Sequence, residues 1–311
     1  MSRALDTALA AMAPAVWGST FLVTTQFLPQ GYPLTAAMLR ALPAGLLLLA
    51  ITRRLPSPGW WLKIFVLGAV NFTLFWWLLF VAAYRLPGGV AATVGAIQPL
   101  IVLFLAKVLL DQRITPMAVA AGFGGLAGVS LLVLTPQASF DPWGIAAAAG
   151  GAVSMALGGV LTRRWQPPVP ALTFAAWQLT AGGVLLVPVA MLAEPALPPL
   201  STANLLGFAY LCLIGAALTY ILWFRGIARL GPAALAPLGF LSPATAVLLG
   251  WVVLGERLDA VQTAGFLLVV LSVWIGQRAQ RRAAEPEPNA GNALTRLVPA
   301  LPVRSVAGRL R

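Results

Sequence analysis

Two stretches of the chain repeat each other. Residues 85–114 read RLPGGVAATVGAIQPLIVLFLAKVLLDQRI, and residues 229–258 read RLGPAALAPLGFLSPATAVLLGWVVLGERL. An ungapped shift of 144 residues aligns their landmarks: Arg85-Leu86 with Arg229-Leu230, Gln98-Pro99 with Ser242-Pro243, and Asp111-Gln112-Arg113 with Gly255-Glu256-Arg257. Three landmarks in one register indicate an internal duplication. Each stretch contains an apolar run of about twenty residues, the length that a helix needs to cross a bilayer.

The repeat continues upstream with a shift of 138 residues. This shift aligns Leu34-Thr35 with Leu172-Thr173, Gly45 with Gly183, and Arg40 with Gln178. We therefore divide the membrane part into two five-helix repeats, residues 1–135 and 136–280. Because five is odd, the second repeat enters the membrane in the reversed orientation. Inverted repeats of this kind are typical of transporters, whose substrate path lies at the repeat interface.

The rest of the chain is equally apolar. Hydrophobic residues make up 60% of the 311 residues and charged residues only 9%, against ~25% charged in soluble domains. Pro, Gly and charged residues delimit apolar runs at 7–28, 33–52, 61–84, 88–109, 115–134, 142–163, 170–191, 203–227, 232–254 and 260–278. The runs lack the alternation of outer-membrane strands. We expect an all-α membrane protein whose ten transmembrane helices form two inverted five-helix repeats around a central cavity.

The distribution of Lys and Arg predicts the orientation. With both termini on one side, that side receives thirteen Lys and Arg residues near the helix ends, and the other side receives only Arg85 and Arg257. Cytoplasmic connections carry the excess of these residues. We therefore expect a multi-pass protein of the cytoplasmic (inner) membrane with both termini in the cytoplasm. Residues 281–311, rich in polar residues, Pro and Gly, are predicted to be a disordered cytoplasmic tail.

Composition also excludes several classes of function. The net charge of +12 is scattered between apolar runs, so no basic face for nucleic acid is expected. The chain contains no histidine, which excludes His-based metal sites and catalytic triads. We expect no cofactor and no metal. The spacings Gly124-xxx-Gly128 and Ser272-xxx-Gly276 predict close helix packing, within one chain or between protomers of a weak homodimer.

A transport path is indicated by polar side chains at membrane depth. Arg40 lies seven residues past Pro33, so its alpha carbon is expected ~10 Å into the bilayer. The guanidinium could hold a substrate carboxylate, or it could bind carbonyls freed in a neighbouring broken helix. Pro99 and Pro243 each stand about midway along a helix at the same repeat position and are predicted to kink it.

None of the polar residues placed at this depth is acidic, so proton coupling through a membrane carboxylate is not favoured. The alternative is coupling through Asp111 or Glu256, which we place in matched loops. Indole rings inside the helices could hold an ammonium group or fill the core. The candidate substrate-binding residues are Trp17, Thr20, Arg40, Asn71, Trp76, Gln98, Trp177, Gln178, Tyr220 and Ser242.

Several motifs carry a family resemblance. Helix 1 contains Ala-Val-Trp-Gly-Ser-Thr-Phe at 15–21, and the second repeat ends with Leu241-Ser242-Pro243, Gly255-Glu256-Arg257-Leu258 and Gly265. With the ten-helix pattern, these resemble the EamA branch of the drug/metabolite transporter superfamily over residues 5–280. The resemblance implies a transporter of small metabolites rather than an enzyme. The aromatic, carboxylate-free core is most similar to YddG-type amino-acid exporters.

We therefore expect a carrier that exports small zwitterions, with amino acids that have aromatic or neutral side chains as the main class, by alternating access at a midplane site. One alternative is an exporter or facilitator of another small metabolite or drug. A more distant alternative is a membrane enzyme acting on lipid head groups, for which no paired-carboxylate spacing is present.

Overall fold

The computed structural model describes residues 2–86, 88–133, 141–255 and 259–284. These residues form helices joined by turns and short connections. Ten helical segments of the described chain are long and apolar enough to cross a membrane. The predicted all-α membrane fold is confirmed.

The first repeat contains five spans. Their elements are α1 (Arg3–Phe27); α2 (Pro33–Thr52); η1 (Pro58–Trp60), α3 (Trp61–Gly68), η2 (Ala69–Leu74) and α4 (Phe75–Arg85); α5 (Gly88–Gly95) and α6 (Gln98–Leu110); and α7 (Pro116–Val133). Helix α1 begins at Arg3 rather than at residue 7 as predicted, because Ser2 caps it by accepting a hydrogen bond from the Leu5 amide.

The second repeat follows the same order. Its elements are α8 (Pro142–Arg164); α9 (Ala171–Ala193); α10 (Thr202–Cys212), η3 (Leu213–Leu218) and α11 (Thr219–Leu230); α12 (Pro232–Leu235), η4 (Ala236–Phe240) and α13 (Leu241–Leu254); and α14 (Ala260–Ala284). Helix α14 runs through residues 281–284, which we had assigned to the tail. The remainder of the predicted tail, 285–311, lies outside the described residues.

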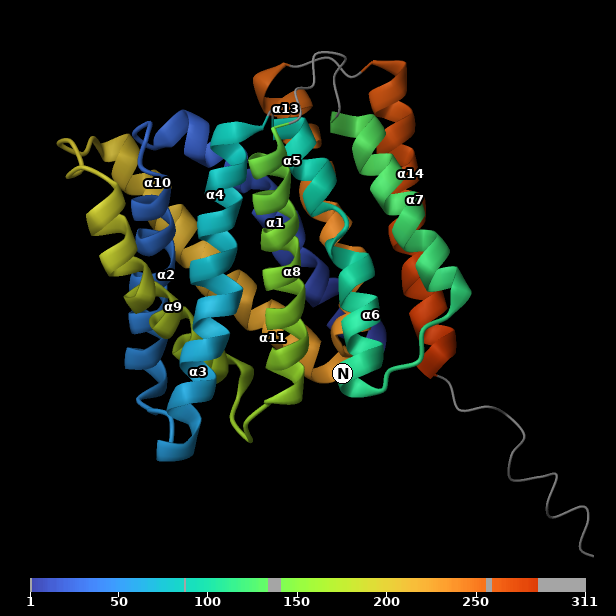
Figure 1. The fold of residues 1–311 in the computed structure, drawn as a ribbon, viewed down its shortest axis with the longest axis horizontal. Helices are drawn as coiled ribbons and strands as arrows, with labels where there is room; N and C mark the ends of the chain where they lie inside the picture. Colours follow the sequence, from blue (N-terminus) through green and yellow to red (C-terminus); the bar gives the residue numbers. More distant parts are fainter. Residues whose placement is uncertain (1, 87, 134–140, 256–258, 285–311) are drawn as a thin grey trace, which may run out of the picture.

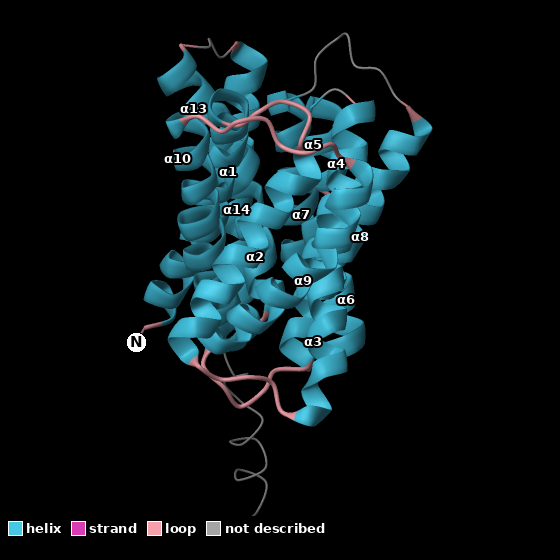
Figure 2. Ribbon diagram, turned by 90° about the vertical axis from the view of Figure 1, so that its left-hand side faces the viewer, coloured by secondary structure: helices cyan, strands magenta, loops and turns pink. Residues whose placement is uncertain are grey.

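Repeat partners pack against each other at the two sides of the bundle. Figure 1 shows α2 beside α9 on the left and α7 beside α14 on the right, with α1, α8 and α11 between the two pairs. The start of α1 and the end of α14 lie at the same end of the bundle, which we call the termini end (Figures 1 and 2). We call the opposite end the far end.

The crossing of α2 and α9 depends on two repeat-related glycines. A Cβ atom on Gly45 would collide with the backbone nitrogen of Thr180, and one on Gly183 would lie 2.6 Å from the Leu42 alpha carbon. Because the obstructing atoms belong to backbone, a side chain at either position would push the helices apart.

Two sets of hydrogen bonds hold the ends of the same helix pair. At the far end, the Glu194 carboxylate after α9 accepts from the Leu34 and Thr35 amides at 2.6 and 2.7 Å, at the start of α2. A carboxylate is favourable there because the first amides of a helix have no partners within it. At the termini end, the Trp177 indole donates to the Arg54 carbonyl at 2.6 Å. Helices α2 and α9 are thus joined at three levels.

Small residues also bring α7 and α14 together. A Cβ atom on Gly124 would lie 2.7 Å from the Ser272 hydroxyl, and one on Gly128 would lie 3.0 Å from the Gly265 carbonyl. Gly276 packs against Pro237 of η4. The small-residue spacings predicted from the sequence therefore serve packing within the chain.

Candidate functional site

Both repeats contain a π-helical turn at the same place. The turns η2 and η3 interrupt the third helix of each repeat, and the shift of 144 residues places one on the other, with Asn71 on Gly215. A π-helical turn releases backbone groups from the regular hydrogen-bond ladder and often occurs at functional sites. In each repeat a polar side chain from the second helix of the other repeat reaches this turn.

In the first case the side chain is Arg40 of α2. Its Nη2 donates to the Gly215 carbonyl in η3 at 2.6 Å, and its Nη1 lies 3.5 Å from the Thr20 hydroxyl of α1. The guanidinium carbon lies 5.4 Å from the centre of the Trp76 ring, within cation–π range. The structure thus brings together three of the predicted residues.

No carboxylate neutralises Arg40 among the described residues. The ion pairs found there involve other arginines, and the Nε atom of Arg40 is buried without a hydrogen-bond partner. A cation at membrane depth is costly unless it has polar or ionic partners. The site therefore retains positive charge and one unused donor, both suited to an anionic group.

Aromatic rings line the region around Arg40. The Trp17 ring lies 5.1 Å from that of Tyr220 and 5.3 Å from that of Trp223, and its indole donates to the Thr219 hydroxyl at 3.0 Å. Phe72 links this group to Trp76, with ring separations of 4.7 Å to Tyr220 and 5.4 Å to Trp76. The predicted Trp17, Trp76 and Tyr220 therefore belong to one aromatic cluster.

In the second case the side chain is Gln178 of α9, the repeat partner of Arg40. Its Oε1 accepts from Asn71 Nδ2 in η2 at 2.8 Å, and Asn71 also donates to the Thr162 hydroxyl at 3.2 Å. All three side chains are buried. Gly158, the repeat partner of Thr20, leaves room for the Asn71 amide, whose Oδ1 occupies the place of a Cβ atom. We call these three side chains the amide cluster.

The predicted proline positions mark breaks in two helices. The fourth span of the first repeat is interrupted between α5 and α6, directly before Gln98 and Pro99. The fourth span of the second repeat contains the 3-10 turn η4, which ends just before Ser242 and Pro243. The breaks face each other, because a Cβ atom on Gly239 of η4 would lie 3.9 Å from Pro99. Gln98 and Ser242 are partly exposed at these breaks.

Helix α1 contacts the second break through Gly18. A Cβ atom on this residue would lie 2.5 Å from the Ser242 carbonyl. The absence of a side chain at Gly18 therefore allows the backbones of α1 and α13 to approach at the midplane.

Trp177 lies apart from these clusters. It packs with Ile64, Leu67 and Phe174 in a separate apolar group, and its indole binds the Arg54 carbonyl. Successive residues of a helix point about 100° apart, so adjacency to Gln178 does not place Trp177 in the same site.

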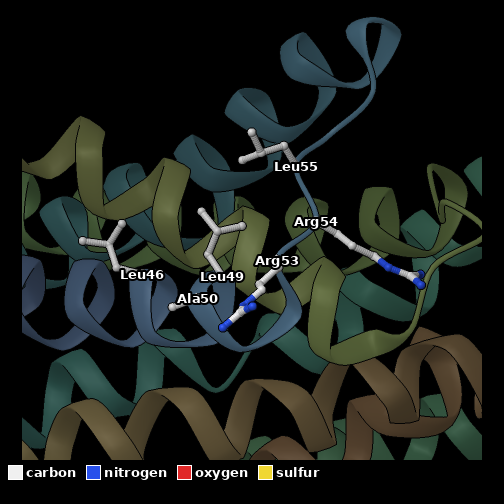
Figure 3. Close-up of a pocket in the computed structure, with 6 residues that line it drawn as sticks. All are labelled: Leu46, Leu49, Ala50, Arg53, Arg54 and Leu55. Atoms are coloured by element: carbon white, nitrogen blue, oxygen red, sulfur yellow. The ribbon is translucent and has the colours of Figure 1, made fainter.

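A hollow of about 410 Å³ also lies away from the midplane, at the termini end of α2 (Figure 3). It is lined by Leu46, Leu49, Ala50, Arg53, Arg54 and Leu55. This hollow is mainly apolar and does not contain the predicted site residues.

The sequence analysis missed two residues of these clusters, Gly215 and Thr162. Gly215 could have been found by applying the 144-residue shift to Asn71, and Thr162 by its position near the end of the sixth predicted helix. Asp6 lies just before the first predicted helix, 7–28, and was not among the candidate residues. In the structure it is a buried residue of α1.

The geometry suits binding rather than bond-breaking chemistry. A guanidinium with a spare donor, two hydroxyls and several ring faces can hold a small molecule that carries a carboxylate. No group of three His, Cys, Asp or Glu side chains able to hold a metal is found in the part of the chain that the structure describes.

Comparison with known proteins places these features in a family. A profile described as the EamA-like transporter family matches residues 7–134 and 142–275, one match in each repeat. The chain belongs to this family. EamA-like proteins are transporters of the drug/metabolite superfamily and not enzymes, so this chain is a multi-pass membrane transporter. The resemblance stated from the sequence motifs is confirmed at the level of the family.

Several relatives cover most of the EamA-like chain. Protein PecM of Dickeya dadantii is 46% identical over 85% of this chain and 90% of its own length. The Uncharacterized inner membrane transporter YedA of Escherichia coli K12 is 30% identical over 83% of this chain and 86% of its own length. A Probable amino-acid metabolite efflux pump of Salmonella typhimurium is 26% identical over 91% of this chain and 99% of its own length. One crystal structure, at 22% identity, covers 91% of this chain and 100% of its own with a TM-score of 0.77, which supports the fold.

Proposed function

We propose that this transporter exports small zwitterions, with amino acids that carry aromatic or neutral side chains as the main class. The observation that carries the proposal is the Arg40 guanidinium, which lies beside Trp76 without an acidic partner among the described residues. A substrate carboxylate supplies the missing negative charge. The rings of Trp17 and Tyr220 offer faces to an ammonium group or to an aromatic side chain.

The transport cycle follows from the repeats. Substrate binds near the midplane, between elements of both halves, and the halves then rock to expose the site to one side of the membrane at a time. The matched helix breaks before Pro99 and Pro243 support this cycle, because they place irregular backbone where the two repeats meet.

The substrate class has two further supports. The Salmonella typhimurium relative is described as an amino-acid metabolite efflux pump, and the motifs resemble those of YddG-type exporters. Another small metabolite or drug, carried with or without a coupling ion, is the competing substrate class.

Reconstitution tests the proposal. Purified protein in liposomes should give saturable flux of labelled phenylalanine, methionine or threonine above that of empty vesicles. Phenethylamine has the ring and the ammonium group of phenylalanine without its carboxylate, so it should compete weakly. Absence of flux for all three amino acids, or equal competition by the amine, would reject this substrate class.

We also infer that the protein lies in the inner membrane with the termini end in the cytoplasm. The thirteen Lys and Arg residues assigned to that side support this orientation. The description of the relative YedA as an inner membrane transporter supports the location. Reporter fusions after residue 284 should be active with a cytoplasmic reporter and inactive with a periplasmic one. The reverse pattern would overturn the orientation.

A further inference from the structure

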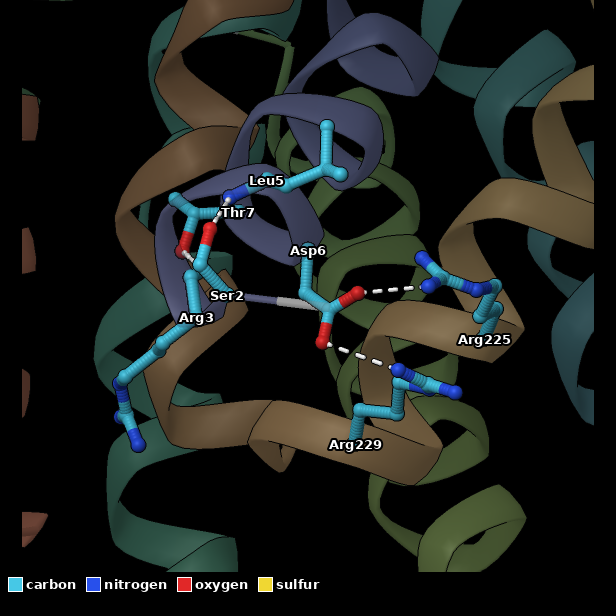
Figure 4. Close-up of polar contacts among 7 residues, drawn as sticks. All are labelled: Ser2, Arg3, Leu5, Asp6, Thr7, Arg225 and Arg229. Carbon is cyan, nitrogen blue, oxygen red and sulfur yellow. Dashed lines mark hydrogen bonds and ion pairs between the residues drawn. The ribbon is translucent and has the colours of Figure 1, made fainter.

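Asp6 is a buried acid that the binding site does not use. Only 8% of its side chain is exposed, and it lies where α1 meets α11 at the termini end. One carboxylate oxygen accepts from Arg225 at 2.6 Å and the other from Arg229 at 3.3 Å (Figure 4). The two arginines are one turn apart near the end of α11. A single carboxylate therefore joins two helices through two charged hydrogen bonds.

The contact between these helices continues from the ion pairs towards the Arg40 site. A Cβ atom on Gly226 would lie 2.9 Å from the Ala10 Cβ, and Ala13 is completely buried. Farther along, the Trp17 indole binds Thr219. The α1–α11 contact thus lies between the Arg40 site and the termini end.

A related ion pair lies at the far end. Arg85, the repeat partner of Arg229, lies 3.4 Å from Asp141, which caps the start of α8. Helix α8 is the repeat partner of α1, and a Cβ atom on its Gly144 would lie 2.6 Å from the Leu86 side chain. The two pairs differ in burial, because the Arg85 and Asp141 side chains are 52% and 31% exposed. Solvent weakens exposed pairs more strongly than buried ones.

We propose that Asp6, Arg225 and Arg229 form the gate that holds the transporter closed towards the termini end. The proposal rests on the alternating-access function. Substrate that enters from that end must pass between α1 and α11, so the two ion pairs break when the gate opens. Arg40 is linked to the same helix through the Gly215 carbonyl in η3, which continues into α11. A substrate carboxylate that binds Arg40 in place of this carbonyl removes one of two restraints on the α1–α11 contact. The Asp6 ion pairs are the second restraint.

Thiol labelling tests the gate without requiring a substrate. Cys212 is the single cysteine of the chain and is replaced by Ser. Ala13→Cys then reports on the buried contact, and N-ethylmaleimide is applied to protein in nanodiscs, where both faces are accessible. Asp6→Asn should raise the labelling rate about tenfold, because it weakens two charged hydrogen bonds that favour the closed state. The matched change Asp141→Asn, at the far end, should leave the rate unchanged or lower it.

Folding is monitored by size exclusion and thermal unfolding. If Asp6→Asn fails to fold, Arg229→Gln is used, since Arg229 is 48% exposed and its loss is milder. An unchanged labelling rate in a folded gate variant, or an equal increase with Asp141→Asn, would overturn the gate. Because labelling does not depend on flux, this result is separate from a failure of the amino-acid assay.

Discussion

In one half of the site, α2 directs Arg40 to the Gly215 carbonyl of η3, and in the other, α9 directs Gln178 to the Asn71 amide of η2. The positions are equivalent under the repeat, and both side chains reach a π-helical turn of the opposite half. One position carries a cation without an acidic partner among the described residues, whereas the other carries a neutral amide within a buried cluster. The repeat partner of Thr20, which lies beside Arg40, is Gly158, which lies beside Asn71.

In our proposal, this difference gives the duplicated backbone a single binding site. The inverted repeats provide two positions with equivalent backbone geometry, and the side chains at these positions form different contacts. The side chains of the amide cluster bind one another across η2, α8 and α9, although Asn71 Oδ1 and Gln178 Nε2 have no hydrogen-bond partner among the described residues. In our proposal, the charged position completes its bonds with substrate.

The largest effect of a substitution is expected at the two glycines that occupy the same position in both repeats. Gly45→Ala and Gly183→Ala should each reduce the yield of monodisperse protein about tenfold, because the added methyl group meets backbone atoms of the partner helix. Size exclusion of solubilised membranes measures this yield. Gly159→Ala is the matched control, since its Cβ would have no neighbour closer than 4.0 Å. A normal yield from either variant would show that the crossing tolerates separation.

The next largest effect, on transport, is expected at Arg40 and distinguishes it from the amide cluster. Arg40→Gln should lower the flux per molecule at subsaturating amino acid about tenfold to a hundredfold, the range for loss of a charged hydrogen bond. Glutamine can still donate to the Gly215 carbonyl, so the thermal midpoint should change by only a few degrees. Liposome flux and thermal unfolding of the same preparation measure both quantities. A large loss of stability with flux retained in the folded fraction would assign Arg40 to structure alone.

The amide cluster should show the opposite pattern. Asn71→Leu removes the donor to the Thr162 hydroxyl and the shorter of the two hydrogen bonds to Gln178 Oε1, and should lower the stability by about 1–2 kcal/mol, the range for hydrogen bonds between membrane helices. Thermal unfolding in detergent measures the loss, with flux normalised to folded protein. If flux falls as strongly as with Arg40→Gln, the two positions share one function and the comparison fails.

The smallest effect distinguishes two tryptophans. Trp17→Phe keeps an aromatic ring but removes the hydrogen bond to Thr219, so the half-saturation concentration should rise about threefold. Trp177→Phe removes a bond to the Arg54 carbonyl outside the aromatic cluster and should leave that concentration unchanged. Concentration series of labelled phenylalanine test both variants. Equal responses would place both rings on the substrate path.

Much of the fold could be predicted because membrane helices follow simple rules. Each span is a continuous apolar run of bilayer length, and the 144-residue shift exposes the duplication without any knowledge of contacts. The association of Asn71 with Gln178 was not deduced, but both residues were singled out because polar side chains at that depth are costly. Depth therefore identifies candidates, whereas their partners depend on how the helices rotate.

The π-helical turns could not be predicted from local sequence. Ala69–Leu74 and Leu213–Leu218 contain no proline, and neighbouring helices supply the groups that occupy the released carbonyls. Ser154 donates to Val70 in one turn, and Arg40 donates to Gly215 in the other. Asp6 was missed for a different reason, since an error of four residues at the start of α1 placed it outside the helix.

The three-level attachment of α2 to α9 constrains how the protein moves. Glu194 holds one end of the pair, the Trp177 indole holds the other, and Gly45 packs on the backbone between them. Changing the crossing angle would break all three attachments at once. We therefore expect the pair to keep its angle through the proposed cycle and to serve as its axis of rotation. Spin labels on α2 and α9 should keep one separation with and without substrate, whereas labels on α1 and α11 should not.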